Sequence, residues 1–183
     1  MHMLMYGAFF GMMTFSYTQP IAQMWMSNFI VSQFEQGSVA YIGEAYESGS
    51  IPRAAWATFF NNYVIQTVLM TVLISLVLPM IGILKTMLSL IVVGFGMAPT
   101  WAGMTGMYTF HSITMTLELE AYIFACICVV FFWGNLVAGA MKNEFLAGLK
   151  RSIQVLMSGT LLAGIMLALA ALYEAATLII ARG

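Results

Sequence analysis

Long apolar segments are the feature that most restricts what this chain can fold into. Several of them exceed the roughly 20 apolar residues that an α-helix needs to cross a bilayer. The stretch from Ala54 to Leu84 is one example. A transmembrane β-barrel does not fit, because its segments are short, about 10 residues, and alternate in hydrophobicity. The sequence therefore predicts an all-α integral membrane protein.

The composition points to the same class of protein. Of the 183 residues, 62% are hydrophobic and only 7% are charged, whereas soluble domains carry about 25% charged residues. Water cannot solvate a surface with so few charges, so we expect the lipid bilayer to cover it. The net charge is −1 and there is no basic tract, so no nucleic-acid partner is expected.

Five hydrophobic segments are expected to form one polytopic helix bundle. They cover residues 3–31, 54–84, 86–98, 117–140 and 152–180. Gln19 and Pro20 interrupt the first segment, which is either one kinked crossing or a short crossing followed by an interfacial piece. In the same segment, Gly7 and Gly11 form a G-x-x-x-G pair that permits close helix approach. A tight turn at Lys85 is expected between the second and third segments.

Two stretches between these segments have a distinct character. The polar loop at residues 32–53 is either a solvated connector, with a short amphipathic turn from Val39 to Tyr46, or a docking surface for another subunit. Residues 99–116 are too rich in glycine and polar residues for a regular lipid-facing helix. Irregular backbone at membrane depth is tolerated only where protein buries it or it lines a cavity. We therefore expect either a re-entrant segment or a loop with aromatic residues at headgroup level.

Two amides stand near the start of the second segment. Asn62 and Gln66 are one turn apart and share a helix face. Amides in membrane helices hydrogen-bond to neighbouring helices, at about 1 kcal/mol each. The pattern predicts a polar seam between helices, with a transport pathway as the alternative.

Three glutamates lie at the edges of hydrophobic segments. Glu118 and Glu120 begin the fourth segment, and Glu174 lies near the end of the fifth. Residues two apart do not share a helix face, so Glu118 and Glu120 are expected to have different partners. Three interpretations stay open: acids favoured by the dipole in a first helical turn, an inward acid that organises the bundle, and an ion or proton site.

His111 precedes Glu118 by seven residues, which on a helix places them two turns apart on one face. The spacing differs from the H-E-x-x-H of zinc peptidases, and no metal site is predicted. There is no nucleotide-binding loop, nucleophile elbow or cysteine-rich cluster, so no enzyme is predicted. The sequence specifies no cofactor, since its apolar and aromatic side chains suit bound lipid, quinone or carotenoid equally.

The distribution of cations predicts an orientation. With five crossings, one side of the membrane carries more Lys and Arg residues than the other, and cytoplasmic loops carry the excess. This places the N-terminus in the cytoplasm and the C-terminus outside. The richer side holds Lys85, Lys142, Lys150 and Arg151, and the other side holds Arg53 and Arg182.

Four motifs together resemble the stage II sporulation protein M family of small multi-helix membrane proteins. They are FFNNYVIQ at residues 59–66, LIVVGFG at 90–96, LELEAYIFA at 117–125 and LALAALYEAAT at 167–177. The resemblance extends from about residue 54 to residue 183. It implies that Asn62, Gly94, Glu120 and Glu174 occupy motif positions of the family.

The resemblance also implies a role. The sporulation member belongs to a complex that remodels the cell envelope, so this chain is expected to be a non-catalytic subunit in a bacterial or archaeal cytoplasmic membrane. Its partners would then be other membrane protein subunits. The alternative is a pore or transporter component, as a homo-oligomer, that uses its glutamates as ion or proton sites.

Overall fold

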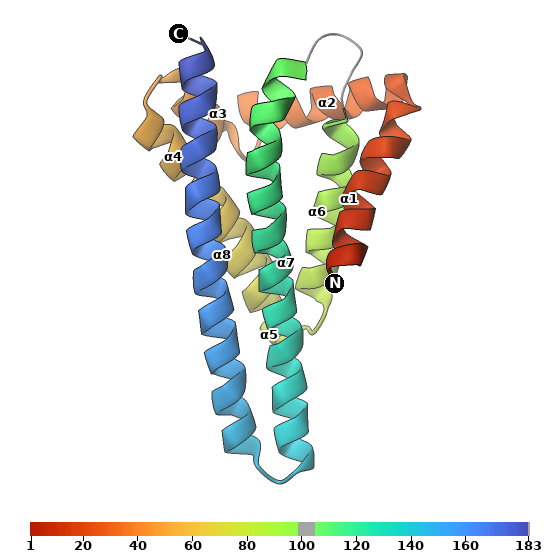
Figure 1. Cartoon of the computed structure of the whole chain (residues 1–183), viewed down its shortest axis with the longest axis vertical. Coiled ribbons are helices and arrows are strands. Elements are labelled where there is room, and N and C mark those ends of the chain that lie inside the picture. Colours follow the sequence, from red (N-terminus) through yellow and green to blue (C-terminus); the bar gives the residue numbers. More distant parts are fainter. Residues whose placement is uncertain (99–104, 183) are drawn as a thin grey trace.

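The computed structural model describes the backbone of residues 1–98 and 105–182 and the side chains of residues 1–98 and 111–181. Within these ranges the chain is helical and contains no strand (Figure 1). The helices are α1 (His2–Tyr17), α2 (Pro20–Glu35), α3 (Ala40–Glu47), α4 (Ile51–Phe59), the π-helix η1 (Phe60–Leu73), α5 (Ile74–Val77), α6 (Ile81–Gly96), α7 (Thr105–Met141) and α8 (Phe145–Arg182). The predicted all-α class is confirmed.

Three helices in the described part of the chain are long and apolar enough to cross a membrane. They comprise Ile51–Val77, which joins α4, η1 and α5, and the residues His111–Met141 of α7 and Phe145–Ala181 of α8. The predicted number of five crossings is therefore too high by this criterion. The three long helices are compatible with a membrane location.

The first predicted segment is two helices rather than one crossing. Helix α1 ends at Tyr17, and Gln19 is the residue before α2. Pro20 begins α2 at a position where the helix needs no backbone N–H donor. Each helix has 16 residues, about 24 Å, and is shorter than the ~30 Å hydrocarbon core. Figure 1 shows α2 lying crosswise to α7 and α8 at the end of the bundle. A single kinked crossing is therefore wrong.

The turn between the second and third segments lies before the predicted position. Leu78 is extended, with φ −123° and ψ 93°, because proline disfavours helical backbone in the residue before it. Met80 follows Pro79 with a positive φ of 71°, and α6 begins at the next residue. Lys85 therefore lies inside α6, and the predicted turn at Lys85 is wrong.

The prediction for residues 99–116 is wrong where the structure describes them. Residues 105–116 are the first turns of α7, and residues 99–104 lie outside the described ranges. Polar residues do not interrupt the helix here because a threonine hydroxyl can bond to the helix's own backbone. Thr116 Oγ1 donates to the carbonyl oxygen of Ser112 at 2.8 Å.

Two connections are shorter than the bounds of the predicted segments imply, namely residues 32–53 and the residues between 140 and 152. In the polar loop 32–53, the predicted amphipathic turn is helix α3, whose buried Ile42 and Ala45 pack against Ala57 of α4. Between α7 and α8, only Lys142–Glu144 remain outside the helices. Both loops shorten because the adjoining helices extend into the polar residues that flank them.

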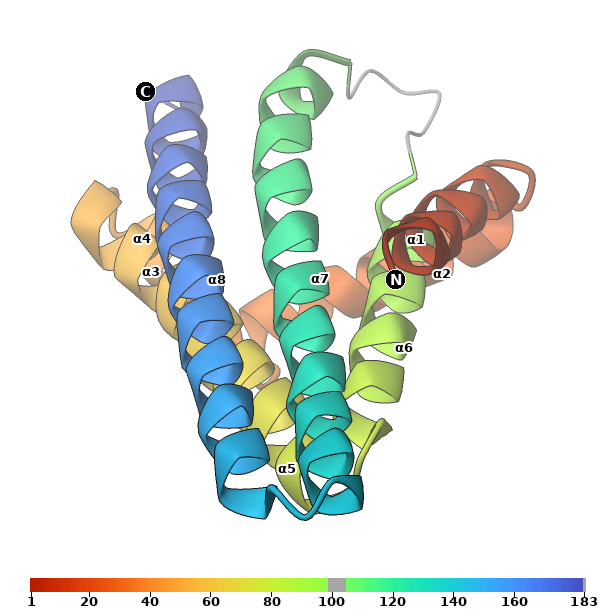
Figure 2. The same ribbon diagram turned by 60° about the horizontal axis from the view of Figure 1, so that its bottom comes forward.

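The antiparallel pair α7 and α8 is the main contact of the fold. Its helices lie close because glycines face the partner helix. A Cβ atom at Gly159 would lie 1.8 Å from the Cys128 sulfur, and one at Gly139 would lie 2.7 Å from the Gly148 Cα. Figures 1 and 2 show α7 between α8 and α6, so it is the central helix of the bundle.

Helix α6 holds α1 and α2 through its C-terminal carbonyls. Carbonyls at the end of a helix lack partners within it. Here three polar side chains donate hydrogen bonds to them. Ser16 donates to the Phe95 oxygen at 2.6 Å, Ser27 donates to the Gly96 oxygen at 2.9 Å, and Gln23 donates to the Ala98 oxygen. The buried amide and hydroxyls thereby fix α1 and α2 to the end of α6.

Gly94 lies at the crossing of α1 and α6. A Cβ atom there would lie 2.5 Å from the Phe9 carbonyl oxygen, whereas Cβ atoms at Gly7 and Gly11 would contact nothing within 4 Å. Helix α1 does approach another helix closely, but the glycine that permits it is Gly94 of α6. Gly7 and Gly11 of the G-x-x-x-G pair face outward.

We predict that Gly94→Ala separates α1 from α6. The methyl group has no room beside the Phe9 backbone, and overpacking of this kind costs about 1–3 kcal/mol. Thermal unfolding in detergent micelles, followed by circular dichroism, should show a lower midpoint. Gly11→Ala is the matched control and should leave the midpoint unchanged or slightly raised. Equal midpoints for Gly94→Ala and the original protein would contradict the described crossing.

Candidate functional site

Glu118 and Glu120 of α7 contact different neighbouring helices. Residues two positions apart on an α-helix are rotated by about 200° around the helix axis. The side chains of Glu118 and Glu120 therefore point to nearly opposite sides. Asn62 of η1 donates from Nδ2 to Glu118 Oε1 at 2.6 Å. On the other side, the Tyr6 hydroxyl donates to Glu120 Oε1 at 2.5 Å, and His2 Nε2 lies 3.1 Å from Glu120 Oε2.

Glu118 belongs to a group of polar side chains from four helices, which we call the glutamate cluster. Its members are Tyr46 of α3, Asn62 of η1, His111 and Glu118 of α7, and Glu174 of α8. His111 Nδ1 lies 3.5 Å from Glu174 Oε1, and the two side chains are 25% and 16% exposed. The Tyr46 hydroxyl hydrogen-bonds to Glu174 and lies 3.3 Å from the Thr58 hydroxyl.

A chain of hydrogen bonds connects α3 to Glu118. The Tyr41 hydroxyl donates to Asn61 Oδ1 at 3.3 Å, Asn61 donates from Nδ2 to Asn62 Oδ1 at 2.9 Å, and Asn62 donates to Glu118. Every donor in this chain points towards the carboxylate. Such an arrangement favours negative charge on the final acceptor, because each bond polarises the next one.

The two tyrosines of α3 are held as hydrogen-bond donors. Burial raises the pKa of Tyr46, and the negative charge of Glu174 raises it further. Burial also raises the pKa of Tyr41. Both phenols therefore keep their protons into alkaline solution, and α3 remains attached to the cluster through neutral hydroxyl groups.

The position of Glu118 and Glu120 within α7 excludes one interpretation. The helix begins at Thr105 rather than near Leu117, so neither acid is in the first turn. Helix-dipole stabilisation falls off within that turn. The interpretation of these acids as first-turn residues is wrong, and inward acids or an ion or proton site remain.

Gln66 lies one turn from Asn62 and reaches a different helix. Lys85 Nζ of α6 donates to Gln66 Oε1, and near it the hydroxyls of Thr71 and Thr86 are 2.7 Å apart. Both amides therefore hydrogen-bond to neighbouring helices, as expected for a polar seam. The seam runs between η1 and α7 at Asn62 and between η1 and α6 at Gln66.

The π-helical geometry of η1 was missed by the sequence reasoning. Residues Phe60–Leu73 carry it, and two threonine hydroxyls bond to carbonyls five residues earlier. Thr67 bonds to the Asn62 oxygen at 2.7 Å, and Thr71 bonds to the Gln66 oxygen at 2.8 Å. A threonine five residues after each amide is the signal in the sequence. Stretches of π-helix are rare and occur frequently at functional sites.

The predicted site residues thus fall in separate places. Asn62, His111, Glu118 and Glu174 come together in the glutamate cluster. Glu120 contacts α1, Gln66 contacts Lys85, and Gly94 lies at the crossing of α1 and α6. The sequence reasoning missed the partners Tyr41 and Tyr46 of the cluster, His2 and Tyr6 beside Glu120, and Lys85 beside Gln66.

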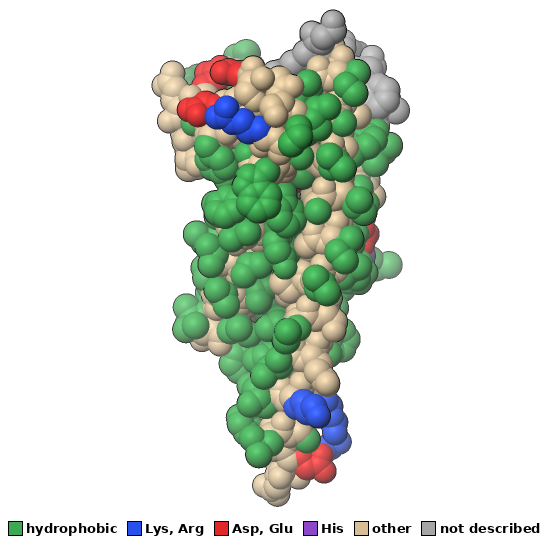
Figure 3. Space-filling view, turned by 90° about the vertical axis from the view of Figure 1, so that its left-hand side faces the viewer, with side chains coloured by type: hydrophobic (Ala, Val, Ile, Leu, Met, Phe, Trp, Pro, Cys, Tyr) green, Lys and Arg blue, Asp and Glu red, His purple; other side chains and the backbone are tan. Residues whose placement is uncertain are grey.

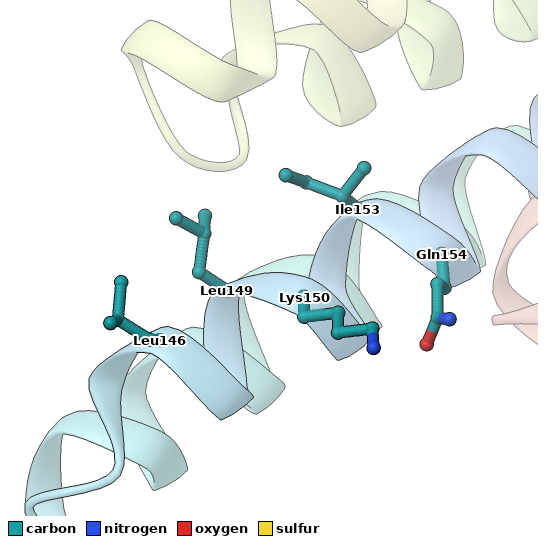
Figure 4. Close-up of a pocket in the computed structure, with 5 residues that line it drawn as sticks. All are labelled: Leu146, Leu149, Lys150, Ile153 and Gln154. Atoms are coloured by element: carbon teal, nitrogen blue, oxygen red, sulfur yellow. The ribbon is translucent and has the colours of Figure 1, made fainter.

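Among the described residues, no group of three histidine, cysteine, aspartate or glutamate side chains is placed to hold a metal ion. A shallow depression lies on the side of α8 near the α7–α8 loop (Figure 4). It is lined by Leu146, Leu149, Lys150, Ile153 and Gln154. The depression is far along α8 from Glu174 and is no part of the glutamate cluster.

Comparison of the chain with models of known protein families, with curated proteins and with solved structures finds no match. The resemblance to the stage II sporulation protein M family therefore rests on the four sequence motifs. Two residues at the motif positions, Asn62 and Glu174, belong to the glutamate cluster. Glu118, which lies in the same motif as Glu120, belongs to it as well.

We predict that Asn62→Ala destabilises the bundle. Glu118 would lose its hydrogen-bond donor, and Asn61 would lose its acceptor. A fully buried polar group without a partner costs about 1–3 kcal/mol. Asn61 and Glu118 are half-buried, so we expect a loss near the lower end of that range. Unfolding in detergent measures the loss, with Asn28→Ala as control because Asn28 is exposed on α2. Equal stability of the two variants would show that the bond to Glu118 contributes nothing.

Proposed function

We propose that this protein is a non-enzymatic integral subunit of a larger membrane protein complex. The observation that supports this most is the pairing of its ionisable groups. Glu118 bonds to Asn62, Glu120 to Tyr6, Glu174 to Tyr46 and Lys85 to Gln66. Each pair joins two helices of the same chain, so these groups fix the bundle rather than present chemistry to a substrate.

The surface supports a role in assembly. Hydrophobic side chains form a continuous belt on the face shown in Figure 3, with basic and acidic groups gathered mainly towards its two ends. The α7–α8 hairpin extends beyond the other helices (Figure 1). Met141 and Leu146 at its tip are 81% and 78% exposed. Together with the outward-facing Gly7 and Gly11, this surface suits contact with helices of other subunits as well as with lipid.

The proposed location is a bacterial or archaeal cytoplasmic membrane, as the family resemblance implies. Lys142, Lys150 and Arg151 lie at the hairpin end of α7 and α8, whereas Arg53 and Arg182 belong to the opposite end. The excess of cations favours a cytoplasmic hairpin. The end of α8 at Arg182 then lies outside.

The test of the complex is purification under mild conditions. The protein should be extracted gently from its native membranes, and everything that co-purifies should be identified by mass spectrometry. We expect a fixed set of membrane protein partners in whole-number ratios. A preparation that contains this chain alone would contradict the proposal.

A second candidate function is that of a pore or transporter component. The glutamate cluster favours it, because Glu174 of α8 pairs with His111 of α7 there and Glu118 of α7 bonds to Asn62. Ionisable groups inside membrane segments often mark ion or proton pathways. A bundle with three spanning helices is too small to enclose a path, so this function requires several copies or partner subunits.

The transport function predicts a flux that depends on Glu174. Vesicles containing the purified protein should show ion or proton flux, and Glu174→Gln should abolish it. Glu144→Gln, in the exposed α7–α8 loop, is the control and should keep the flux. Vesicles without flux, or a flux unchanged in Glu174→Gln, would remove this candidate.

A further inference from the structure

The first turns of α8 present an open face with a shallow depression. Five residues line it, namely Leu146, Leu149, Lys150, Ile153 and Gln154. Four of them are exposed, and Leu149 is half-buried. They follow the spacing i, i+3, i+4, i+7 and i+8, which places residues on one face of a helix. Such a face usually packs against a neighbour, whereas this one is accessible.

A different side of α8 makes the contact with α7. Ser152 Oγ donates to the Phe132 carbonyl oxygen at 2.7 Å, and a Cβ atom at Gly148 would lie 2.7 Å from the Asn135 carbonyl oxygen. Gly148 and Ser152 therefore face α7. The depression lies on another side of the same turns, so a ligand can bind there without disturbing the α7–α8 pair.

The open face has an apolar side and a basic side. Figure 4 shows its three apolar side chains projecting on one side of α8, with Lys150 and Gln154 along the adjoining side. Arg151 follows Lys150 and is also exposed. Towards the middle of α8, the apolar row continues one turn beyond Ile153 to Met157, which is 67% exposed. A ligand that fits this face has a long apolar part and a negatively charged end.

The basic side chains here have no acid partner within the protein. Among residues 1–98 and 111–181, whose side chains the structure describes, both ion pairs found involve a histidine. Glu144 of the α7–α8 loop therefore makes no ion pair with Lys150 or Arg151. Both cations can bind an anion that a ligand brings.

We propose that this face of α8 binds one anionic phospholipid. Its phosphate lies at Lys150 and Arg151, and an acyl chain lies along Leu149, Ile153 and Met157. Arginine binds phosphate through two parallel N–H bonds, and lysine binds it as a point charge. Long basic side chains near a helix end also extend their charge to the headgroup layer while their methylene groups cover apolar surface.

A phospholipid fits this face better than an apolar helix of a partner subunit. Such a helix would cover Lys150 and leave its charge without a counterion, which is costly. A lipid supplies the apolar chain and the negative charge in one molecule. The cytoplasmic leaflet, where the proposed orientation places the hairpin, contains anionic lipids. The lipid site rests on the proposed membrane location and is independent of both candidate functions, so co-purification, flux and lipid binding can each fail alone.

Native mass spectrometry of the full-length protein in detergent measures lipid binding directly. Phosphatidylglycerol is added at increasing concentrations, and phosphatidylcholine with the same acyl chains is added in parallel. We expect one phosphatidylglycerol to bind roughly tenfold or more tightly than phosphatidylcholine, because two cations contribute. Lys150→Gln and Arg151→Gln should each weaken phosphatidylglycerol binding about fivefold. Arg53→Gln is the matched control, since it removes the same charge from an exposed position on α4, and it should keep the original affinity.

A further variant and a competitor test the apolar part of the site. Ile153→Ser should weaken the binding of both lipids, because the acyl chain loses a contact, and inorganic phosphate should not displace the bound lipid. Equal affinities for the two lipids, or basic-residue variants that bind phosphatidylglycerol as tightly as Arg53→Gln, would overturn the proposal. Displacement by inorganic phosphate, or a protein crosslinked to Lys150 in native membranes in place of lipid, would overturn it as well.

Discussion

A polar side chain inside a bilayer has no water to bond with, and this constraint governs the whole bundle. Such a group is costly unless it finds a partner within the protein. Among the described residues, the buried hydroxyls of Ser75 and Thr114 are exceptions without a hydrogen-bond partner. Helix α7 meets this demand on two sides, because Glu118 and Glu120 project about 200° apart. One acid connects α7 to η1 through Asn62, and the other connects it to α1 through Tyr6. The central helix is therefore positioned by polar bonds as well as by packing.

Backbone groups follow the same constraint. The carbonyls at the end of α6 have no partners within the helix, and the side chains of Ser16, Gln23 and Ser27 bond to them. These bonds explain why α2 lies across the end of the bundle although its residues are largely apolar. Elsewhere the helices are held by close packing, which glycines make possible. One example is Gly159 of α8 against Cys128 of α7. Polar bonds and glycine contacts together determine which helices are neighbours.

The glutamate cluster brings these effects to one place, where α3, η1, α7 and α8 all contribute. Glu118 joins α7 to η1 through Asn62, and Glu174 joins α8 to α7 through His111. Tyr46 adds α3, since it bonds to Glu174. The polar contacts of the cluster therefore hold these four helices together.

The sequence by itself determined the helical class, the apolar surface and the separate partners of Glu118 and Glu120, because composition and helical periodicity are local properties. It also indicated that Asn62 and Gln66 bond between helices. It did not show that α7 begins at Thr105 or that α2 turns away from α1, since both depend on contacts with distant residues. Only the tertiary structure decided that Glu174 lies beside His111, 63 positions away in the chain. The pairing of α7 with α8 brings them together, and no local pattern encodes the register of two packed helices.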